Sequence, residues 1–212
     1  MRRALLVVDV QRDFCKGGAL AVIGADEVVP KLNAVIDLFT RVSLPVFFTR
    51  DWHPSNHMSF KTRGGPWPPH CIQGSQGAAF HPGLRVPPGA VVIDKGTEPD
   101  YEAYSGFQGT DLKDRLKGDS VDEILIGGLT TDYCVRETTL DALGYGLSVS
   151  VLEDCVRGVN LNAGDSVKAL REIAAKGARL VQSSLVLASY DALRRGRKLD
   201  DGVPAQSRTK TG

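Results

Sequence analysis

Two kinds of apolar pattern alternate along the chain. Short unbroken apolar runs, such as ALLVVDV at 4–10, have the length and composition of strands that are covered on both faces. The predicted strands occupy residues 4–10, 44–51, 90–96, 122–129, 147–154 and 178–184. Segments with apolar residues at helical spacing follow or precede them, at 26–42, 110–117, 132–146, 162–177 and 185–196. This alternation predicts a three-layer α/β/α fold, with a six-stranded, mainly parallel sheet and helices on both faces.

The chain has 212 residues, a length that suits one α/β domain. We expect residues 1–195 to form this single domain and the polar residues 196–212 to form a flexible C-terminal tail. Residues 52–89 interrupt the alternation because they are rich in proline and glycine. An irregular stretch of that length inside a compact domain is usually functional.

Composition and charge restrict the class of protein. The formal net charge is +1, so no general electric field would attract nucleic acid or an anionic membrane. No apolar stretch approaches the roughly 18 residues of a membrane span. The start, MRRALLVVDVQRDF, lacks the small-residue cleavage site of a secretion signal, and the four cysteines form no CxxC pair. We therefore expect reduced thiols in a cytoplasmic protein.

Reactive side chains stand at the ends of several predicted strands. Asp9, Asp51 and Lys95 end three of them, and Cys134 follows a fourth. The carboxyl ends of parallel strands share one edge of the sheet, where the connecting loops open a crevice. The pattern predicts a single site that contains all four side chains.

Cys134, in GGLTTDYCVRETTLDALGYG, has two interpretations. A single cysteine near a helix start is most often packing. At a helix N-terminus, however, free N–H groups and the helix dipole favour a thiolate. Lys95 would then be a second activator and Asp9 the base that takes the thiol proton.

A second cluster lies in DWHPSNH at 51–57 and PWPPHC at 66–71. Asp51 and His53 point to the same side of an extended strand end. His57 and His70 are brought near by turns that contain proline. One carboxylate and up to three imidazoles suit Zn²⁺, Fe²⁺ or Mn²⁺, whereas a solvated turn is the alternative.

The chain resembles the nicotinamidase/pyrazinamidase branch of the isochorismatase-like cysteine hydrolases over residues 3–184. The resemblance rests on LLVVDVQRDFCKGGALAV, TRDWHPSNHMSF, WPPHC, GAAFHP, DKGTEPDYEAYSGF and GGLTTDYCVRETTLDA. It implies a catalytic triad of Asp9, Lys95 and Cys134. It also implies one divalent metal ion on Asp51, His53, His57 and His70.

The resemblance further implies a non-proline cis peptide at Leu129–Thr130 and an oxyanion hole made by the N–H groups of Thr130 and Cys134. Four residues match positions that line the family's substrate pocket, and the last of them is a place where members differ: Phe14, Trp67, Tyr104 and Tyr133. The activity implied is hydrolysis of nicotinamide to nicotinate and ammonia through a cysteine thioester, with pyrazinamide also accepted. The enzyme would be a monomer or a homo-oligomer without a nucleic-acid or membrane partner.

Two alternatives stay open at this point. A related amidase of the same superfamily would act on a ureido or carbamoyl compound, but such enzymes generally lack the metal ligands. A metal-binding or redox-sensing protein would use the fold without turnover, but it would need a broken triad or a thiol without a base, and here all three positions are filled.

Overall fold

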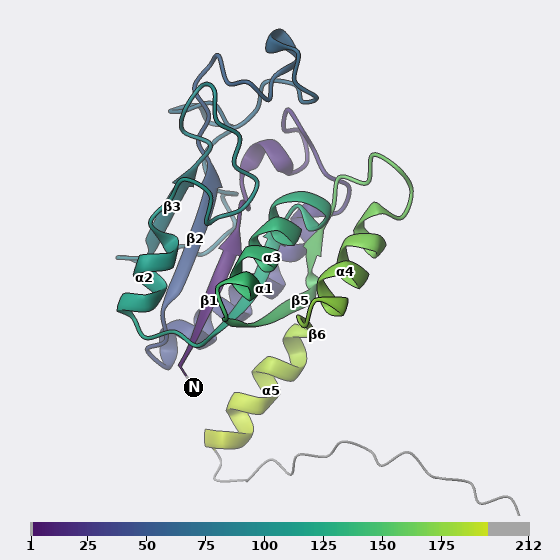
Figure 1. The fold of residues 1–212 in the computed structure, drawn as a ribbon. Coiled ribbons are helices and arrows are strands. Elements are labelled where there is room, and N and C mark those ends of the chain that lie inside the picture. Colours follow the sequence, from purple (N-terminus) through teal and green to yellow (C-terminus); the bar gives the residue numbers. More distant parts are fainter. Residues whose placement is uncertain (1, 195–212) are drawn as a thin grey trace, which may run out of the picture.

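The computed structural model describes residues 2–194, and the predicted alternation of strands and helices is present in them (Figure 1). The strands are β1 (Arg3–Val8), β2 (Val46–Asp51), β3 (Val91–Lys95), β4 (Glu123–Leu129), β5 (Ser148–Arg157) and β6 (Arg179–Val181). The tail expected at 196–212 lies outside the described residues.

The six strands form one sheet in the order β3-β2-β1-β4-β5-β6. Every neighbouring pair is parallel, so the predicted fold class is confirmed and the described sheet is wholly rather than mainly parallel. The chain runs outward from β1 to β3 and then returns to place β4 against the other side of β1. The loops after β1 and β4 therefore leave on either side of the point where the strand order reverses, which is where open α/β sheets bind ligands.

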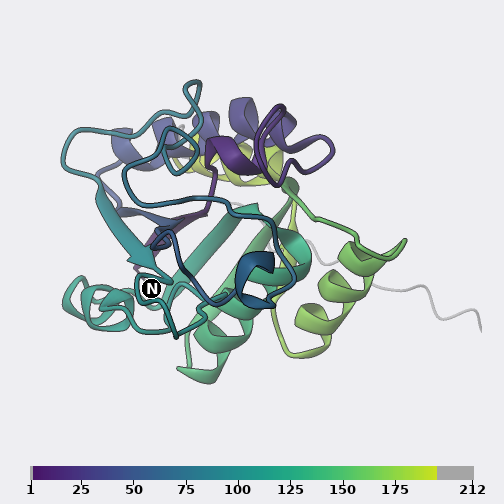
Figure 2. The ribbon, with the colours of Figure 1, turned by 90° about the horizontal axis from the view of Figure 1, so that it is seen from above.

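Helices cover both faces of the sheet (Figures 1 and 2). One face carries α1 (Val28–Arg41) and α5 (Ser183–Arg194). The other carries α2 (Leu112–Gly118), α3 (Arg136–Gly144) and α4 (Asp165–Ala175). Side chains alternate along each strand, so β1 sends Leu5 and Val7 to the first face and Leu6 and Val8 to the second. Burial on both faces explains why the strand sequences are continuously apolar.

The end of β4 lies unusually close to β1. Gly128 has φ +131°, and a Cβ at this position would lie 2.0 Å from the carbonyl oxygen of Val8. A residue with a side chain would push the two strands apart. The glycine before the nucleophile segment is therefore required by the close approach of two strands.

Three boundaries differ from the sequence-based expectation. The helix predicted from 132 begins instead as a π-helical turn, Thr131–Val135, in which the N–H groups of Tyr133 and Val135 both donate to the carbonyl of Thr130. The helix predicted from residue 26 begins as α1 only at Val28, because Ala25–Glu27 form a 3-10 turn in which the Asp26 carboxylate accepts a hydrogen bond from the N–H of Lys16. Strand β5 extends to Arg157 because a register shift lets its pairing with β4 continue past the expected end.

Among the described residues, no helix has both the length and the apolar character that crossing a bilayer requires.

Candidate active site

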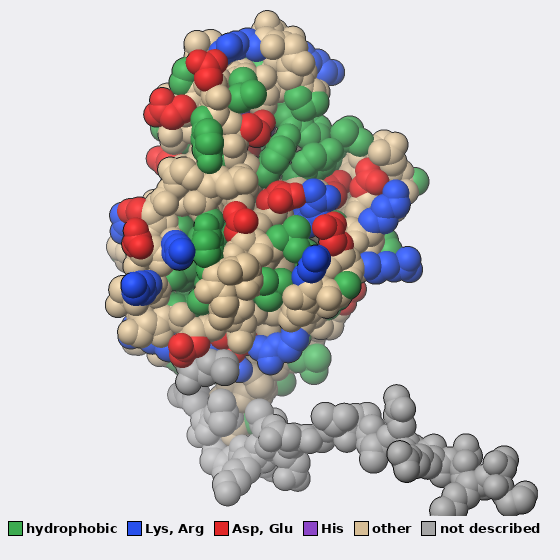
Figure 3. Space-filling model, in the orientation of Figure 1, with side chains coloured by type: hydrophobic (Ala, Val, Ile, Leu, Met, Phe, Trp, Pro, Cys, Tyr) green, Lys and Arg blue, Asp and Glu red, His purple; other side chains and the backbone are tan. Residues whose placement is uncertain are grey.

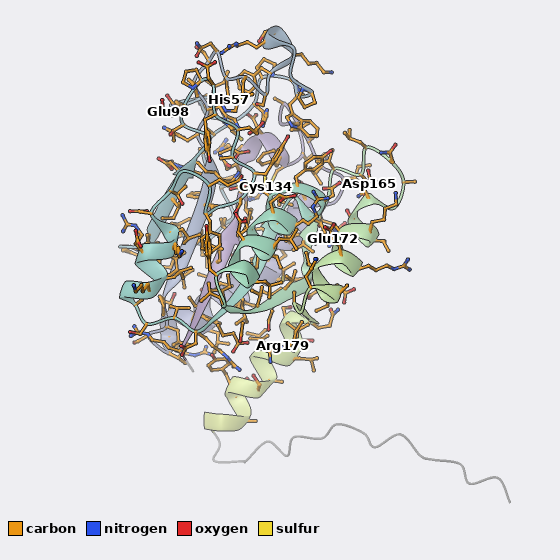
Figure 4. The ribbon with its side chains drawn as sticks, in the orientation of Figure 1. His57, Glu98, Cys134, Asp165, Glu172 and Arg179 are labelled. Carbon is orange, nitrogen blue, oxygen red and sulfur yellow. The ribbon has the colours of Figure 1, made fainter. Side chains whose placement is uncertain are left out.

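Four predicted side chains converge at the carboxyl edge of the sheet. Asp9 follows β1, Asp51 and Lys95 are the last residues of β2 and β3, and Cys134 lies in the turn between β4 and α3. Figure 4 shows Cys134 at this end of the sheet, below the loops that carry His57. Each of the four side chains is at least 95% buried. The single site expected from the strand ends is therefore present in the fold.

Lys95 is the centre of this group. Its Nζ lies 3.0 Å from Oδ2 of Asp9 and 3.5 Å from Sγ of Cys134. It also donates to Oδ1 of Asp51 and, at 3.1 Å, to the carbonyl oxygen of Ala103. A completely buried ammonium group needs such partners, because an isolated charge is costly in the interior. The contacts raise the pKa of Lys95 well above its usual value even though burial lowers it, so the residue is a fixed positive charge.

Asp9 stands between the nucleophile candidate and β2. One carboxylate oxygen of Asp9 and Sγ of Cys134 lie within 4.8 Å of each other. Oδ1 of Asp9 accepts a hydrogen bond of 2.6 Å from the hydroxyl of Thr49. Sequence reasoning missed Thr49, because a threonine inside a strand carries no signal of this contact. Asp9 itself has φ +49°, so the chain turns sharply where β1 ends.

The protonation states follow from burial. Burial raises the pKa of Asp9 to about 6, against the opposing effects of Lys95 and Thr49. Burial also raises the pKa of the Cys134 thiol well above its usual value; Lys95 lowers it, but the carboxylates of Asp9 and Asp51 raise it further. Lys95 therefore acts on the thiol in the expected direction, although the effect of burial is larger. The thiol lies beside a carboxylate that can accept its proton.

Three of the four predicted metal ligands are brought together. Asp51, His53 and His70 each offer one ligand atom, and these atoms all lie within 4.8 Å of one another. Nε2 of His53 and Nε2 of His70 lie 3.6 Å and 3.9 Å from Oδ2 of Asp51. All three side chains are buried.

The hydrogen bonds of the two histidine rings test whether this set fits a metal ion. Nδ1 of His53 lies 2.8 Å from the carbonyl oxygen of Gly96, and Nδ1 of His70 lies 2.8 Å from that of Pro68. A carbonyl oxygen only accepts, so each Nδ1 carries a proton, and Nε2, which faces Asp51, is the ring nitrogen left for a metal ion. Metal-binding histidines are held in this way. The set fits a divalent cation such as zinc.

His57, the fourth predicted ligand, does not join this group. Its Nε2 lies 3.0 Å from the carbonyl oxygen of Tyr101, so this nitrogen carries the proton. Its Nδ1 contacts the hydroxyl and the N–H of Ser59. The ring stacks on that of His53, with 4.1 Å between centroids. Both nitrogens of His57 are thus used by backbone and serine partners, and its role as a ligand stays a prediction.

Gly96, which was not among the predicted site residues, makes room for His53. It has φ +59°, and a Cβ there would lie 2.5 Å from Cε1 of the His53 ring. The sequence did offer one signal for Gly96: a glycine that directly follows a strand ending in a candidate catalytic lysine.

The predicted pocket residues surround the mouth of the site. Phe14, Trp67, Tyr104 and Tyr133 line one cavity together with Asp51, His70, Thr130 and Cys134. Nε1 of Trp67 donates to the hydroxyl of Tyr104 at 3.0 Å, and the ring of Tyr133 lies 5.0 Å and 5.4 Å from the Trp67 and Tyr104 rings. Leu20 and Val159 complete the wall and were missed. Hydrophobic side chains also gather on the upper part of the face that Figure 3 shows.

The peptide bond between Leu129 and Thr130 is cis, at the position that the resemblance implied. Thr130 is buried and lines the same cavity as Cys134. Thr130 and the nucleophile candidate thus border the same space, where a small ligand would lie.

Comparison with known proteins agrees with this geometry. The model of the isochorismatase domain matches residues 3–184. The nicotinamidase of Escherichia coli is 43% identical over 199 residues, which cover 84% of this chain and 93% of that protein. The nicotinamidase/pyrazinamidase of Mycobacterium tuberculosis is 40% identical over 192 residues, covering 86% of this chain and all of that one. The pyrazinamidase of Pyrococcus horikoshii, solved in complex with zinc, superimposes with a TM-score of 0.82 at 49% identity and covers 86% of this chain and 99% of its own. With its parallel sheet, its buried Asp–Lys–Cys group and these relatives, the chain belongs to the isochorismatase family.

Proposed function

We propose that this protein is a nicotinamidase, a hydrolase that converts nicotinamide to nicotinate and ammonia and also accepts pyrazinamide. The observation that carries the proposal is the position of Lys95, which contacts Asp9, Asp51 and Cys134 at once. A thiol, a carboxylate that can take its proton and a fixed cation are the parts that nucleophilic cleavage of an amide needs. The E. coli and M. tuberculosis relatives carry the name of this activity.

The first half of the reaction forms a thioester. Asp9 accepts the proton of Cys134 as the sulfur attacks the amide carbon, and Lys95 offsets the negative charge that this transfer creates. The backbone N–H groups of Thr130 and Cys134 are the candidates for holding the developing oxyanion. One such donor is typically worth about 3–4 kcal/mol in the transition state. Protonated Asp9 then gives its proton to the leaving nitrogen, and ammonia departs.

The second half releases the acid. Asp9, again a carboxylate, takes a proton from water, which attacks the thioester carbon. The tetrahedral intermediate collapses with cleavage of the carbon–sulfur bond, and the Cys134 sulfur regains a proton from Asp9. A carboxyl group with a pKa of about 6 can alternate between acid and base near neutral pH.

The pocket accounts for a small aromatic substrate. Trp67, Tyr104 and Tyr133 form a connected aromatic wall, and Phe14 packs beside His70 with 5.6 Å between ring centroids. A flat pyridine or pyrazine ring would stack within this wall, which places the carboxamide toward Cys134.

Asp51, His53 and His70 are the residues proposed to hold a divalent metal ion. The ion would supply a Lewis-acid contact for the ring nitrogen and so orient the substrate. The ligand types allow Zn²⁺, Fe²⁺ or Mn²⁺, and the zinc complex of the P. horikoshii pyrazinamidase favours Zn²⁺.

The deciding experiment measures ammonia release by the purified protein from nicotinamide, pyrazinamide and a small carbamoyl compound. Nicotinamide and pyrazinamide are expected to be hydrolysed, and a chelator is expected to reduce the rate until metal is restored. Hydrolysis of the carbamoyl compound alone would instead support the related amidase. No ammonia release from any of the three would contradict an amidase function.

We also propose that the enzyme acts in the cytoplasm on free small molecules, as a monomer or homo-oligomer and without a nucleic-acid or membrane partner. The near-neutral net charge of +1 supports the absence of a general attraction to polyanions.

A further inference from the structure

Asp51 lies beyond the last hydrogen-bonded pair between β1 and β2. The register of these strands ends with Val8 opposite Thr49, because β1 turns away at Asp9. On its other side Asp51 still pairs with Lys95 of β3. The backbone of Asp51 therefore lacks a strand partner on the β1 side. Yet the carboxylate of this residue contacts Lys95 and faces the two histidines.

The side chain of Gln11 replaces that partner. The N–H of Asp51 donates to Oε1 of Gln11 at 2.8 Å, and Nε2 of Gln11 donates to the carbonyl oxygen of Asp51 at 2.8 Å. The same Nε2 also donates to the carbonyl oxygen of Ala78 at 2.9 Å. One amide thus forms the two bonds that a neighbouring strand would form, and it extends the sheet by one residue.

Gln11 is itself held rigidly. Its side chain is fully buried, and its backbone N–H donates to the carbonyl of Asp9 at 2.8 Å. On either side of it, the N–H of Arg12 donates to Ala79 and the carbonyl of Val10 accepts from His81. Its backbone also forms an isolated bridge with Phe80. The amide therefore presents a fixed pair of groups to Asp51.

We propose that Gln11 is a positioning residue that fixes the Asp51 carboxylate between Lys95 and the two histidines. The inference rests on the metal centre of the proposed function, and it assigns Gln11 no contact with substrate or metal. Without the amide, the Asp51 peptide loses both hydrogen bonds on its β1 side. Its carboxylate can then move toward Lys95 and away from Nε2 of His53 and His70. Partners that orient metal ligands typically account for 10–100-fold in metal affinity.

The test compares Gln11→Met with Asn33→Leu. Methionine keeps the length of the side chain and removes both bonds to Asp51. Asn33 of α1, which is not part of the candidate site, makes the same kind of two-point contact: Nδ2 donates to the carbonyl oxygen of Gly83, and Oδ1 accepts from the N–H of Arg85, both at 2.8 Å. Its replacement by leucine removes an equivalent pair of bonds and so controls for a general loss of stability.

Zinc affinity is measured by competition with a coloured chelator, and folding of the metal-free proteins is followed by circular dichroism. We expect Gln11→Met to bind zinc about 10–100-fold more weakly than the wild type, and Asn33→Leu to bind it within about twofold. The visible spectrum of the cobalt-loaded Gln11→Met protein is expected to differ from that of the wild type, because it reports the arrangement of the ligands.

If the methionine variant does not fold, Gln11→Asn takes its place in the zinc-affinity measurement. It keeps the amide but is one methylene shorter, so it cannot make both bonds to Asp51 without a shift of the backbone. We expect a smaller loss of zinc affinity in the same direction. If a folded Gln11 variant binds zinc as tightly as the wild type, the role of Gln11 is overturned, but the proposed metal centre is not. A wild-type protein that binds no zinc would overturn the proposed metal centre and this inference with it.

Discussion

Asp51 and Lys95 form a buried ion pair that connects the candidate catalytic group with the candidate metal centre. Oδ1 of Asp51 accepts a hydrogen bond from Nζ of Lys95, while Oδ2 faces Nε2 of His53 at 3.6 Å. Burial by itself would raise the pKa of Asp51, but Lys95 and His53 hold it well below its usual range. The carboxylate therefore stays charged and is shared by both parts of the site.

Replacement of Cys134 by alanine is expected to abolish catalysis and to leave the metal centre intact. The loss of the nucleophile in a catalytic triad typically costs on the order of 10⁴-fold or more in rate. Ammonia release and zinc content are measured on the same preparation. Cys155→Ala, at another buried thiol without a catalytic neighbour, is the control. Substantial turnover by Cys134→Ala would remove the nucleophile assignment.

The shared position of Asp51 predicts a double effect for Asp51→Asn. The variant is expected to lose zinc affinity and also stability, because Lys95 keeps only Asp9 as a charged partner. Breaking a buried charge pair costs about 3–5 kcal/mol. Zinc titration and urea unfolding of the metal-free protein measure the two effects. His70→Ala, which touches Asp51 only on the metal side, is expected to show the loss of affinity with a smaller change in unfolding free energy.

His57 provides a test of which predicted ligands bind the metal. Because its nitrogens bond to Ser59 and Tyr101, His57→Gln is expected to weaken zinc binding by at most about tenfold, through the loss of its contact with His53. His53→Ala is expected to weaken it far more. Equal losses of zinc affinity in the two variants would return His57 to the set of ligands.

The pH dependence of kcat/KM is expected to follow Asp9. Below about pH 6 the carboxyl group is protonated and cannot accept the thiol proton, so kcat/KM should fall about tenfold per pH unit. Thr49→Val removes a hydrogen bond that lowers the pKa of Asp9. The acid limb should therefore move to higher pH, by roughly one unit. An acid limb at the same pH in both proteins would assign it to another group.

Lys95→Met should make stability depend on pH in a defined direction. The variant leaves Asp9 and Asp51 buried beside each other without a cation, so their pKa values rise in the folded state. A carboxyl group whose pKa is raised by folding binds protons more readily in the folded protein, so the variant gains stability as the pH falls through that raised pKa. Its deficit relative to wild type should thus shrink from about pH 8 to about pH 5 in urea unfolding of the metal-free proteins. Lys31→Met, at an exposed pair with Asp154, is the control.

Much of the fold could be read from local pattern. Continuous apolar runs predicted the strands because both faces of this sheet are covered, and the alternation with helices predicted parallel pairing. The positions of Asp9, Asp51 and Lys95 at strand ends predicted a shared site, because parallel strands bring their carboxyl ends to one edge. The family resemblance added the cis peptide and the aromatic pocket.

Contacts between distant segments decided the rest. His57 has the carbonyl of Tyr101 as a partner, and the pKa of Cys134 is raised by burial and by two carboxylates. The contacts of Thr49 with Asp9 and of Gln11 with Asp51 each join residues 40 positions apart. The sequence by itself determined which side chains are available and at which strand ends they stand. The tertiary structure decided their protonation, their hydrogen-bond partners and their membership of the site, because these properties depend on burial and on neighbours that local sequence does not encode.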